Sequence, residues 1–213
     1  ADAIVSGAMS FAGQKCTATR RVIVLEEVAE TMDRLLAERI EALVVGDPAR
    51  DGVTVGPLIS SDAVEDFEQA ASAALEAGGE VVARAGSGEG GYFVSPVLIR
   101  QDDPMATVNQ EETFGPLLTV MTVPDAAAAI EAANSTRFGL VGAVHGRDLG
   151  NAVEVVSKIR CGLRRINAPT PGVDYYAPFG GEGMSSFGPR EQGRAAREFF
   201  TSTTTMTVVP AAS

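Results

Sequence analysis

The stretch LLTVMTVPDAAAAIEAANSTRFGLVGAVHGRDLGNAVEVVSKIRCGLRRIN, residues 117–167, decides the fold class. It alternates apolar runs of strand length with segments of helical periodicity: strands at 117–123, 139–146 and 162–167, and helices at 125–135 and 149–160. Strands separated by helices pair in parallel through right-handed crossovers. The alternation therefore predicts an α/β fold with an open, largely parallel sheet flanked by helices.

The same alternation extends toward the N-terminus. It predicts helices at 2–12, 28–43 and 61–79 and strands at 20–27, 80–85 and 92–100, with an ordered loop at 44–60. After residue 167 comes a Gly- and Pro-rich loop, 168–189, which is long enough to indicate a functional role. A short helix at 190–200 and a Thr-rich strand then close the chain. We expect two parts: an α/β domain, 1–189, and a C-terminal helix and oligomerisation strand, 190–213.

Composition narrows the class of protein. The chain has 213 residues, of which 45% are hydrophobic and 21% charged, as in an ordinary globular protein. Its net charge of −11 argues against a nucleic-acid partner. No apolar run has membrane-spanning length, and with two cysteines the chain is not a disulfide scaffold, so we expect a cytoplasmic protein. With one histidine, His145, a histidine-rich metal site cannot form, and no metal is expected.

Three segments contain residues that could take part in a catalytic site. They are FAGQKCTATRR (11–21), which places Cys16 on a turn, NQEETFGPLL (109–118), and PFGG (178–181) within the long loop. Taken singly, each has a simpler interpretation: a small core cysteine, an acidic turn, and a structural turn closed by phenylalanine packing. Their order and spacing together favour a catalytic site.

These segments resemble the aldehyde dehydrogenase superfamily, which has GQ-x-C, then E-x-F-G-P about a hundred residues later, then PFGG near the C-terminus. The similarity runs over essentially the whole chain and includes GDP (46–48), GPLIS (56–60) and the SPVLI segment. The tail PFGG…SSFGPREQGRAAREFFT also resembles the branch that oxidises 2-oxoglutarate semialdehyde (2,5-dioxopentanoate). The resemblance implies oxidation of an aldehyde to the acid with NAD or NADP as cofactor.

The resemblance also implies residue roles. Cys16 matches the nucleophile, which forms a thiohemiacetal and then a thioester. Glu112 matches the carboxylate that binds the nicotinamide ribose, and Phe114 the aromatic residue beside it. Phe179 matches an aromatic residue of the substrate tunnel. The strand 203–209 is expected to pair across a subunit boundary and so build a homo-oligomer.

Other residues receive simpler interpretations. Cys161 is expected to be a packing residue, and Lys15 and Arg20 to be surface charges unless they lie close enough to Cys16 to lower its pKa. Candidates for binding a substrate carboxylate are three arginines: Arg164, Arg165 and Arg190. The chain departs from the family at Glu182–Gly183–Met184, where relatives usually have a basic residue.

The resemblance begins fifteen residues before Cys16, so we expect the family's dinucleotide-binding half, with its general-base glutamate, to be absent from this chain. The chain alone is then expected to be inactive. Two alternatives stay open: a non-catalytic assembly domain derived from the fold, and cysteine-dependent acyl transfer without a cofactor. Retention of Cys16, Glu112 and Phe114 argues against the first, and the lack of a partner base argues against the second.

Overall fold

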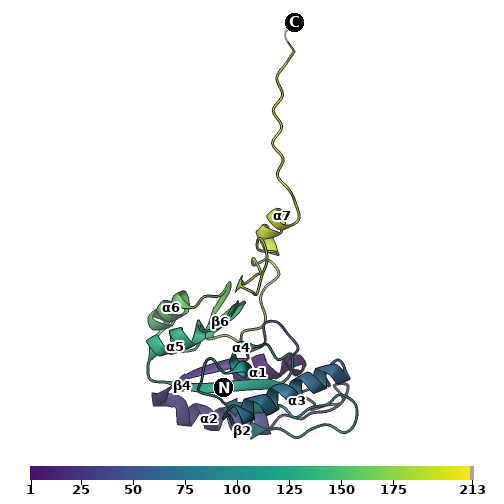
Figure 1. Ribbon diagram of the computed structural model, residues 1–213, viewed down its shortest axis with the longest axis vertical. Coiled ribbons are helices and arrows are strands. Elements are labelled where there is room, and N and C mark those ends of the chain that lie inside the picture. Colours follow the sequence, from purple (N-terminus) through teal and green to yellow (C-terminus); the bar gives the residue numbers. More distant parts are fainter. Residues whose placement is uncertain (212–213) are drawn as a thin grey trace.

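Strand β4 (Leu117–Val123) lies between β1 (Arg21–Leu25) and β3 (Val97–Arg100) and pairs with both in parallel. Strand β2 (Glu80–Arg84) adds an antiparallel edge, giving the order β1-β4-β3-β2. Figure 1 shows this sheet in the computed structural model, which describes residues 1–211. The predicted α/β fold with a mostly parallel sheet is therefore confirmed.

The remaining elements surround this sheet. In chain order they are α1 (Asp2–Met9), η1 (Ser10–Gly13), α2 (Glu26–Glu41), α3 (Ser61–Glu76), α4 (Thr107–Gln110), α5 (Ala126–Ala133), β5 (Phe138–Gly139), β6 (Val141–Val144), α6 (Leu149–Lys158), β7 (Leu163–Ile166), β8 (Glu182–Gly183), η2 (Gly193–Ala195) and α7 (Ala196–Phe199). Helices α3, α5 and α6 begin with Ser60, Asp125 and Asp148, whose side chains each accept a hydrogen bond from a first-turn N–H.

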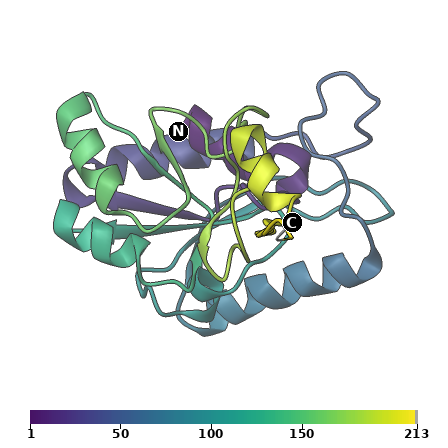
Figure 2. The same cartoon turned by 90° about the horizontal axis from the view of Figure 1, so that it is seen from above.

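Successive side chains of β1 point to opposite faces of the sheet and pack into two different cores. Val22 and Val24 join the main core, to which α2 contributes Leu36 and Ile40. Ile23 packs instead into a smaller cluster with Met121 of β4 and alanines of α5. Because successive strand residues point to opposite faces, the sheet carries α2 on one face and α5 on the other. Figures 1 and 2 show these helices apart, with the sheet between them.

The prediction of a single open sheet is wrong in one respect. Strand β6 pairs in parallel with β7 as a separate sheet, and β5 pairs antiparallel with β8. The predicted strand 139–146 is thus divided at Leu140. The cause is a long-range contact, since β8 lies within the loop 168–189, where composition predicts no regular structure.

The C-terminal predictions also need correction. The helix expected at 190–200 is reduced to η2 and α7, because Gln192 and Gly193 adopt positive φ angles of 64° and 52°, which no α-helix allows. Residues 201–211 form no strand and extend away from the body (Figure 1). A strand needs a neighbour to pair with, and the described part of the chain places none beside this segment.

Candidate active site

Cys16 lies exposed in a turn between η1 and β1. The turn closes with a 3.0 Å hydrogen bond from the Ala18 N–H to the Lys15 carbonyl. Within residues 1–211, no acceptor is recorded for the N–H groups of Cys16 and Thr17, the two central residues of this turn. The turn therefore presents a thiol together with two adjacent backbone donors, which is a suitable arrangement for stabilising an oxyanion.

Gln14 holds the start of the turn in place. Its amide nitrogen donates to the carbonyls of Phe11 (3.1 Å) and Pro57 (3.3 Å), and its amide oxygen accepts from the Ile59 N–H (2.9 Å). These bonds fasten the turn to the GPLIS segment. The role of Gln14 was not predicted, because nothing in the local pattern shows that two of its partners, Pro57 and Ile59, lie more than forty residues away.

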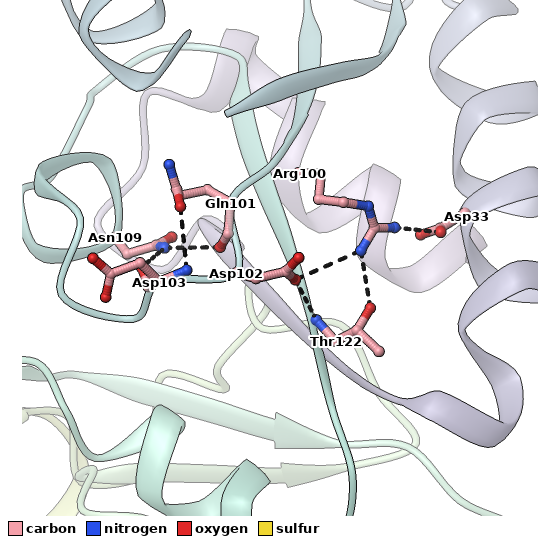
Figure 3. A network of polar contacts seen from close by, with 7 residues as sticks. All are labelled: Asp33, Arg100, Gln101, Asp102, Asp103, Asn109 and Thr122. Atoms are coloured by element: carbon pink, nitrogen blue, oxygen red, sulfur yellow. Dashed lines mark hydrogen bonds and ion pairs between the residues drawn. The ribbon is translucent and has the colours of Figure 1, made fainter. Parts of the chain in front are cut away.

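Phe114 follows α4, and hydrogen bonds of Asn109, a residue of α4, hold this part of the chain in place. The buried Asn109 amide donates to the carbonyls of Gln101 (3.2 Å) and Asp103 (2.8 Å) and accepts a 2.8 Å bond from the Thr119 hydroxyl. Figure 3 shows the Asn109 contacts with residues 101–103, beside a second group in which Arg100 lies between Asp33 and Thr122. These contacts leave Glu112 and Phe114 exposed at the surface of a fixed segment.

Arg20 joins this segment to the cysteine turn. One guanidinium nitrogen donates to the Gly115 carbonyl (2.8 Å), and the other donates to the carbonyls of Gly13 and Lys15. The guanidinium carbon also lies 5.6 Å from the centre of the Phe114 ring. Burial lowers the pKa of Arg20, while the nearby charge of Glu112 acts in the opposite direction. Arg20 is therefore a partly buried structural cation, contrary to the expectation of a surface charge.

Phe179 comes from the long loop and is fixed by its backbone. Its N–H and carbonyl pair with the carbonyl and N–H of Glu191, at 2.6 and 2.9 Å. Arg190 donates to the Gly181 carbonyl, and the Gly181 N–H donates to the Ser186 hydroxyl at 2.6 Å. This loop therefore has a defined structure, although no helix and only one two-residue strand interrupts it.

One pocket of about 490 Å³ brings these segments together. It is lined by Gln14, Lys15, Cys16, Thr17, Phe114, Pro171, Gly172, Val173, Phe179 and Gln192. Cys16, Phe114 and Phe179 thus meet at one place although they are far apart in the sequence. Glu112 does not line this pocket.

The arginines proposed for substrate binding have other partners. Arg164, Arg165 and Arg190 donate to the carbonyls of Ile159, Gly172 and Gly181, respectively. Lys15 is instead the charged member of the pocket lining, and its ammonium group lies 3.8 Å from the centre of the Phe11 ring. A place for Lys15 beside the substrate was not predicted from the sequence.

Cys161 is buried in a separate environment. Its thiol donates a 3.2 Å bond to the Leu163 carbonyl, and burial raises its pKa, with Arg164 acting in the opposite direction. A buried neutral thiol is a packing residue. Across residues 1–211 no cluster of histidine, cysteine and acidic side chains could hold a metal, and no helix is long and apolar enough to cross a bilayer.

The chain is similar in sequence to known dehydrogenases of semialdehydes. The chain is 36% identical over 216 residues to alpha-ketoglutaric semialdehyde dehydrogenase of Bacillus subtilis, covering 99% of this chain and 44% of that protein. It is 35% identical over 208 residues to alpha-ketoglutarate semialdehyde dehydrogenase of Haloferax volcanii, covering 94% and 42%. The chain therefore spans less than half the length of these relatives.

Solved structures give the same result. A salicylaldehyde dehydrogenase from Pseudomonas putida G7, complexed with salicylaldehyde, superposes with a TM-score of 0.89 at 31% identity, covering 100% of this chain and 43% of that one. Betaine aldehyde dehydrogenase from Staphylococcus aureus, in complex with NAD+, gives 0.88 at 28% identity, covering 93% and 40%. The profile of the Aldehyde dehydrogenase family matches residues 1–206. This chain belongs to the aldehyde dehydrogenase family.

Proposed function

We propose that this chain is the catalytic-cysteine part of an NAD(P)-dependent aldehyde dehydrogenase, with Cys16 as the nucleophile. The observation that carries the proposal is the pocket that joins an exposed Cys16 to Phe114 and Phe179. A scaffold has no need of an exposed thiol at the meeting point of three separate segments. The relatives named above, which are dehydrogenases of aldehydes, support the same reaction.

Cys16 supplies the covalent chemistry in this proposal. Its thiol releases a proton to solvent, and the thiolate sulfur attacks the aldehyde carbon, so that the carbonyl oxygen takes the negative charge in forming a thiohemiacetal. The N–H groups of Cys16 and Thr17 stabilise the negative oxygen that develops. A nicotinamide cofactor, when bound, supplies the acceptor for the hydride that the thiohemiacetal carbon loses. Water then hydrolyses the Cys16 thioester to the carboxylic acid and the free thiol.

Glu112 and Phe114 fit a nicotinamide nucleotide. An exposed carboxylate accepts hydrogen bonds from the two vicinal hydroxyls of a ribose, and a half-exposed phenyl ring offers a flat apolar contact. Among the solved relatives, the Staphylococcus aureus enzyme was determined with NAD+. We assign ribose binding to Glu112 and contact beside it to Phe114, with NAD or NADP as the cofactor.

We further propose a semialdehyde that carries a carboxylate, 2-oxoglutarate semialdehyde in particular, as the substrate. Two of the relatives bear that substrate in their names. Lys15, next to Cys16, gives the pocket a positive charge, and Phe179 contributes an apolar wall.

We propose that the C-terminal part, residues 190–213, is a unit distinct from domain 1–189 and that it forms the contacts of a homo-oligomer. Its described portion exposes Phe200, Met206 and Val208, which would be covered by a partner subunit. We also assign the protein to the cytoplasm, a reducing compartment that suits the free thiols of Cys16 and Cys161.

The experiment uses the full-length product of the gene and follows formation of reduced nicotinamide with 2-oxoglutarate semialdehyde. We expect Cys16→Ser to reduce kcat by about 10³-fold or more, because a serine hydroxyl is a far poorer nucleophile than a cysteine thiolate. Cys161→Ser is the matched control and should keep most of the activity. Activity that survives in Cys16→Ser would refute the proposal. Residues 1–213 alone are expected to show no turnover.

A further inference from the structure

We propose that Arg20 is a positioning residue that sets the placement of the nucleophile turn relative to the Glu112–Phe114 segment. This inference rests on the proposed function and adds a residue to it. Arg20 touches neither the thiol nor a substrate. It acts through the backbone of the two segments, whose relative position the proposed reaction requires to be fixed.

Arg20 donates hydrogen bonds to both segments, two to the nucleophile turn and one to the Glu112–Phe114 side. On one side its donors reach the carbonyls of Gly13 and Lys15, which precede Cys16. On the other side they reach the Gly115 carbonyl at 2.8 Å, next in the chain to Phe114. A displacement of either segment therefore breaks bonds to the same guanidinium group.

The chemistry of the group explains why an arginine is present. A guanidinium group is a rigid planar fork with five N–H donors, so it can bind several carbonyls in different directions at once. An ammonium group is a compact point charge and cannot span the same set of acceptors. Arg20 also lies 5.6 Å from the Phe114 ring, so it supports the aromatic side chain as well as the backbone.

The backbones of the two segments touch directly, which restricts their movement relative to each other. Gly13 has a φ of 70°, and a Cβ at this position would overlap the Gly115 carbonyl. The two segments are thus in direct contact beside the guanidinium group, without an intervening side chain. The 13–18 turn and the 112–116 segment behave as one unit as long as Arg20 holds both.

Arg21 provides a matched control within the same chain. It is also a partly buried arginine that donates to two backbone carbonyls, those of Ala132 (3.1 Å) and Ala133 (3.0 Å) at the end of α5. Burial lowers the pKa of both arginines. The two residues differ in what they hold, since Arg21 contacts no part of the pocket lining.

The experiment compares Arg20→Lys with Arg21→Lys in the full-length gene product. Hydrogen–deuterium exchange followed by mass spectrometry should show faster exchange in peptides covering 13–18 and 112–117 for Arg20→Lys. For Arg21→Lys it should show faster exchange near 132–136 instead. Arg20→Gln, which keeps an amide donor without the charge, serves as the second variant if the lysine variant fails to fold, and the same pattern is expected.

Kinetics supply the second measurement. In Arg20→Lys we expect kcat/KM to fall about 100-fold, through kcat and a weaker cofactor Kd, because misplacement by about 1 Å has effects of that size. Alkylation of Cys16 by iodoacetamide should change less than about threefold, since the thiol itself is untouched. Arg21→Lys should keep kcat/KM within about twofold.

The outcomes separate this inference from the function on which it rests. A wild-type protein that oxidises no aldehyde contradicts the proposed function, while the exchange pattern still tests whether Arg20 joins the two segments. An active wild type whose Arg20→Lys variant matches Arg21→Lys in exchange and in kcat/KM overturns the inference alone. Faster exchange confined to 13–18 also overturns it, because both segments must respond.

Discussion

The backbone of Gly13 lies against the carbonyl group of Gly115, so closely that no side chain fits between them. This contact brings the residues before Cys16 directly onto the E-x-F-G-P segment. The contact explains Gly13, whereas a Cβ added to Gly115 would instead meet the Phe67 ring at 2.9 Å. The guanidinium group of Arg20 lies beside the contact and donates to the carbonyls of both glycines.

This contact predicts a large effect for Gly13→Ala. The new Cβ would overlap the Gly115 carbonyl and would require an alanine at a φ of 70°. We expect a loss of more than about 3 kcal/mol in the free energy of unfolding. Gly52→Ala is the control, because Gly52 has a φ of 83° but nothing within 4 Å of an added Cβ, and it should cost about 1 kcal/mol. Urea denaturation measures both, and equal losses would contradict the close contact.

Asn109 should be important for stability although it is not part of the pocket lining. Asn109→Ala removes three hydrogen bonds and leaves the buried Thr119 hydroxyl and two backbone carbonyls without that partner. We expect a cost of about 2–4 kcal/mol by chemical denaturation. Asn151→Ala, on the exposed face of α6, should change stability by less than about 0.5 kcal/mol. An Asn109→Ala protein as stable as the wild type would show that the network contributes nothing.

The ion pairs of α2 should differ in strength. Asp33 pairs with Arg100 in a partly buried position, whereas Glu38 pairs with Arg34 at 2.7 Å in the solvent. Asp33→Ala leaves Arg100 with a weaker set of partners, and we expect a loss of about 1–3 kcal/mol. Glu38→Ala should cost less than about 0.5 kcal/mol. Thermal melts of the two variants at low and high salt provide the test, and only the Glu38 effect should vanish on adding salt.

Cys161 should make stability depend on pH in alkaline solution. Burial raises the pKa of this thiol in the folded state. Above the ordinary pKa of a cysteine the unfolded chain loses the proton while the folded chain keeps it, so the free energy of unfolding falls as the pH rises. This contribution is fully present below that ordinary pKa. Cys161→Ala should remove part of the decline seen in urea titrations at rising pH, and a variant that declines as steeply as the wild type would contradict this assignment.

Local patterns predicted the local structure. The repeated apolar spacing of residues 117–167 predicts its helices and strands because side-chain periodicity is a property of neighbouring residues. The division of the predicted strand 139–146 into β5 and β6 was missed because the partner of β5, β8, lies more than forty residues away. The helix expected at 190–200 failed for a local reason that composition conceals, since Gln192, a residue with no special turn tendency, adopts a positive φ.

The candidate site also contains features that local motifs predict and features that only long-range contacts explain. Cys16, Phe114 and Phe179, each of which stands in a recognisable local motif, line one pocket, and their assigned roles stay predictions. Arg20 was expected at the surface, since a sequence shows a charge but not the carbonyl groups it will reach. The roles of Gln14 and Asn109 were missed for the same reason, because their partners become neighbours only after folding.

The walls of the pocket are fixed mainly by contacts to peptide groups. Arg20 and Arg190 bind carbonyls of glycines, and Phe179 is held through its own main chain. Every amino acid has these peptide groups, so the frame does not depend on which side chains face the cavity. Under the proposed function, we therefore expect that positions such as Lys15, Thr17 and Val173 can be exchanged to accept a different aldehyde while Cys16 keeps its place. The range of substrates would then evolve, or be engineered, separately from the catalytic rate.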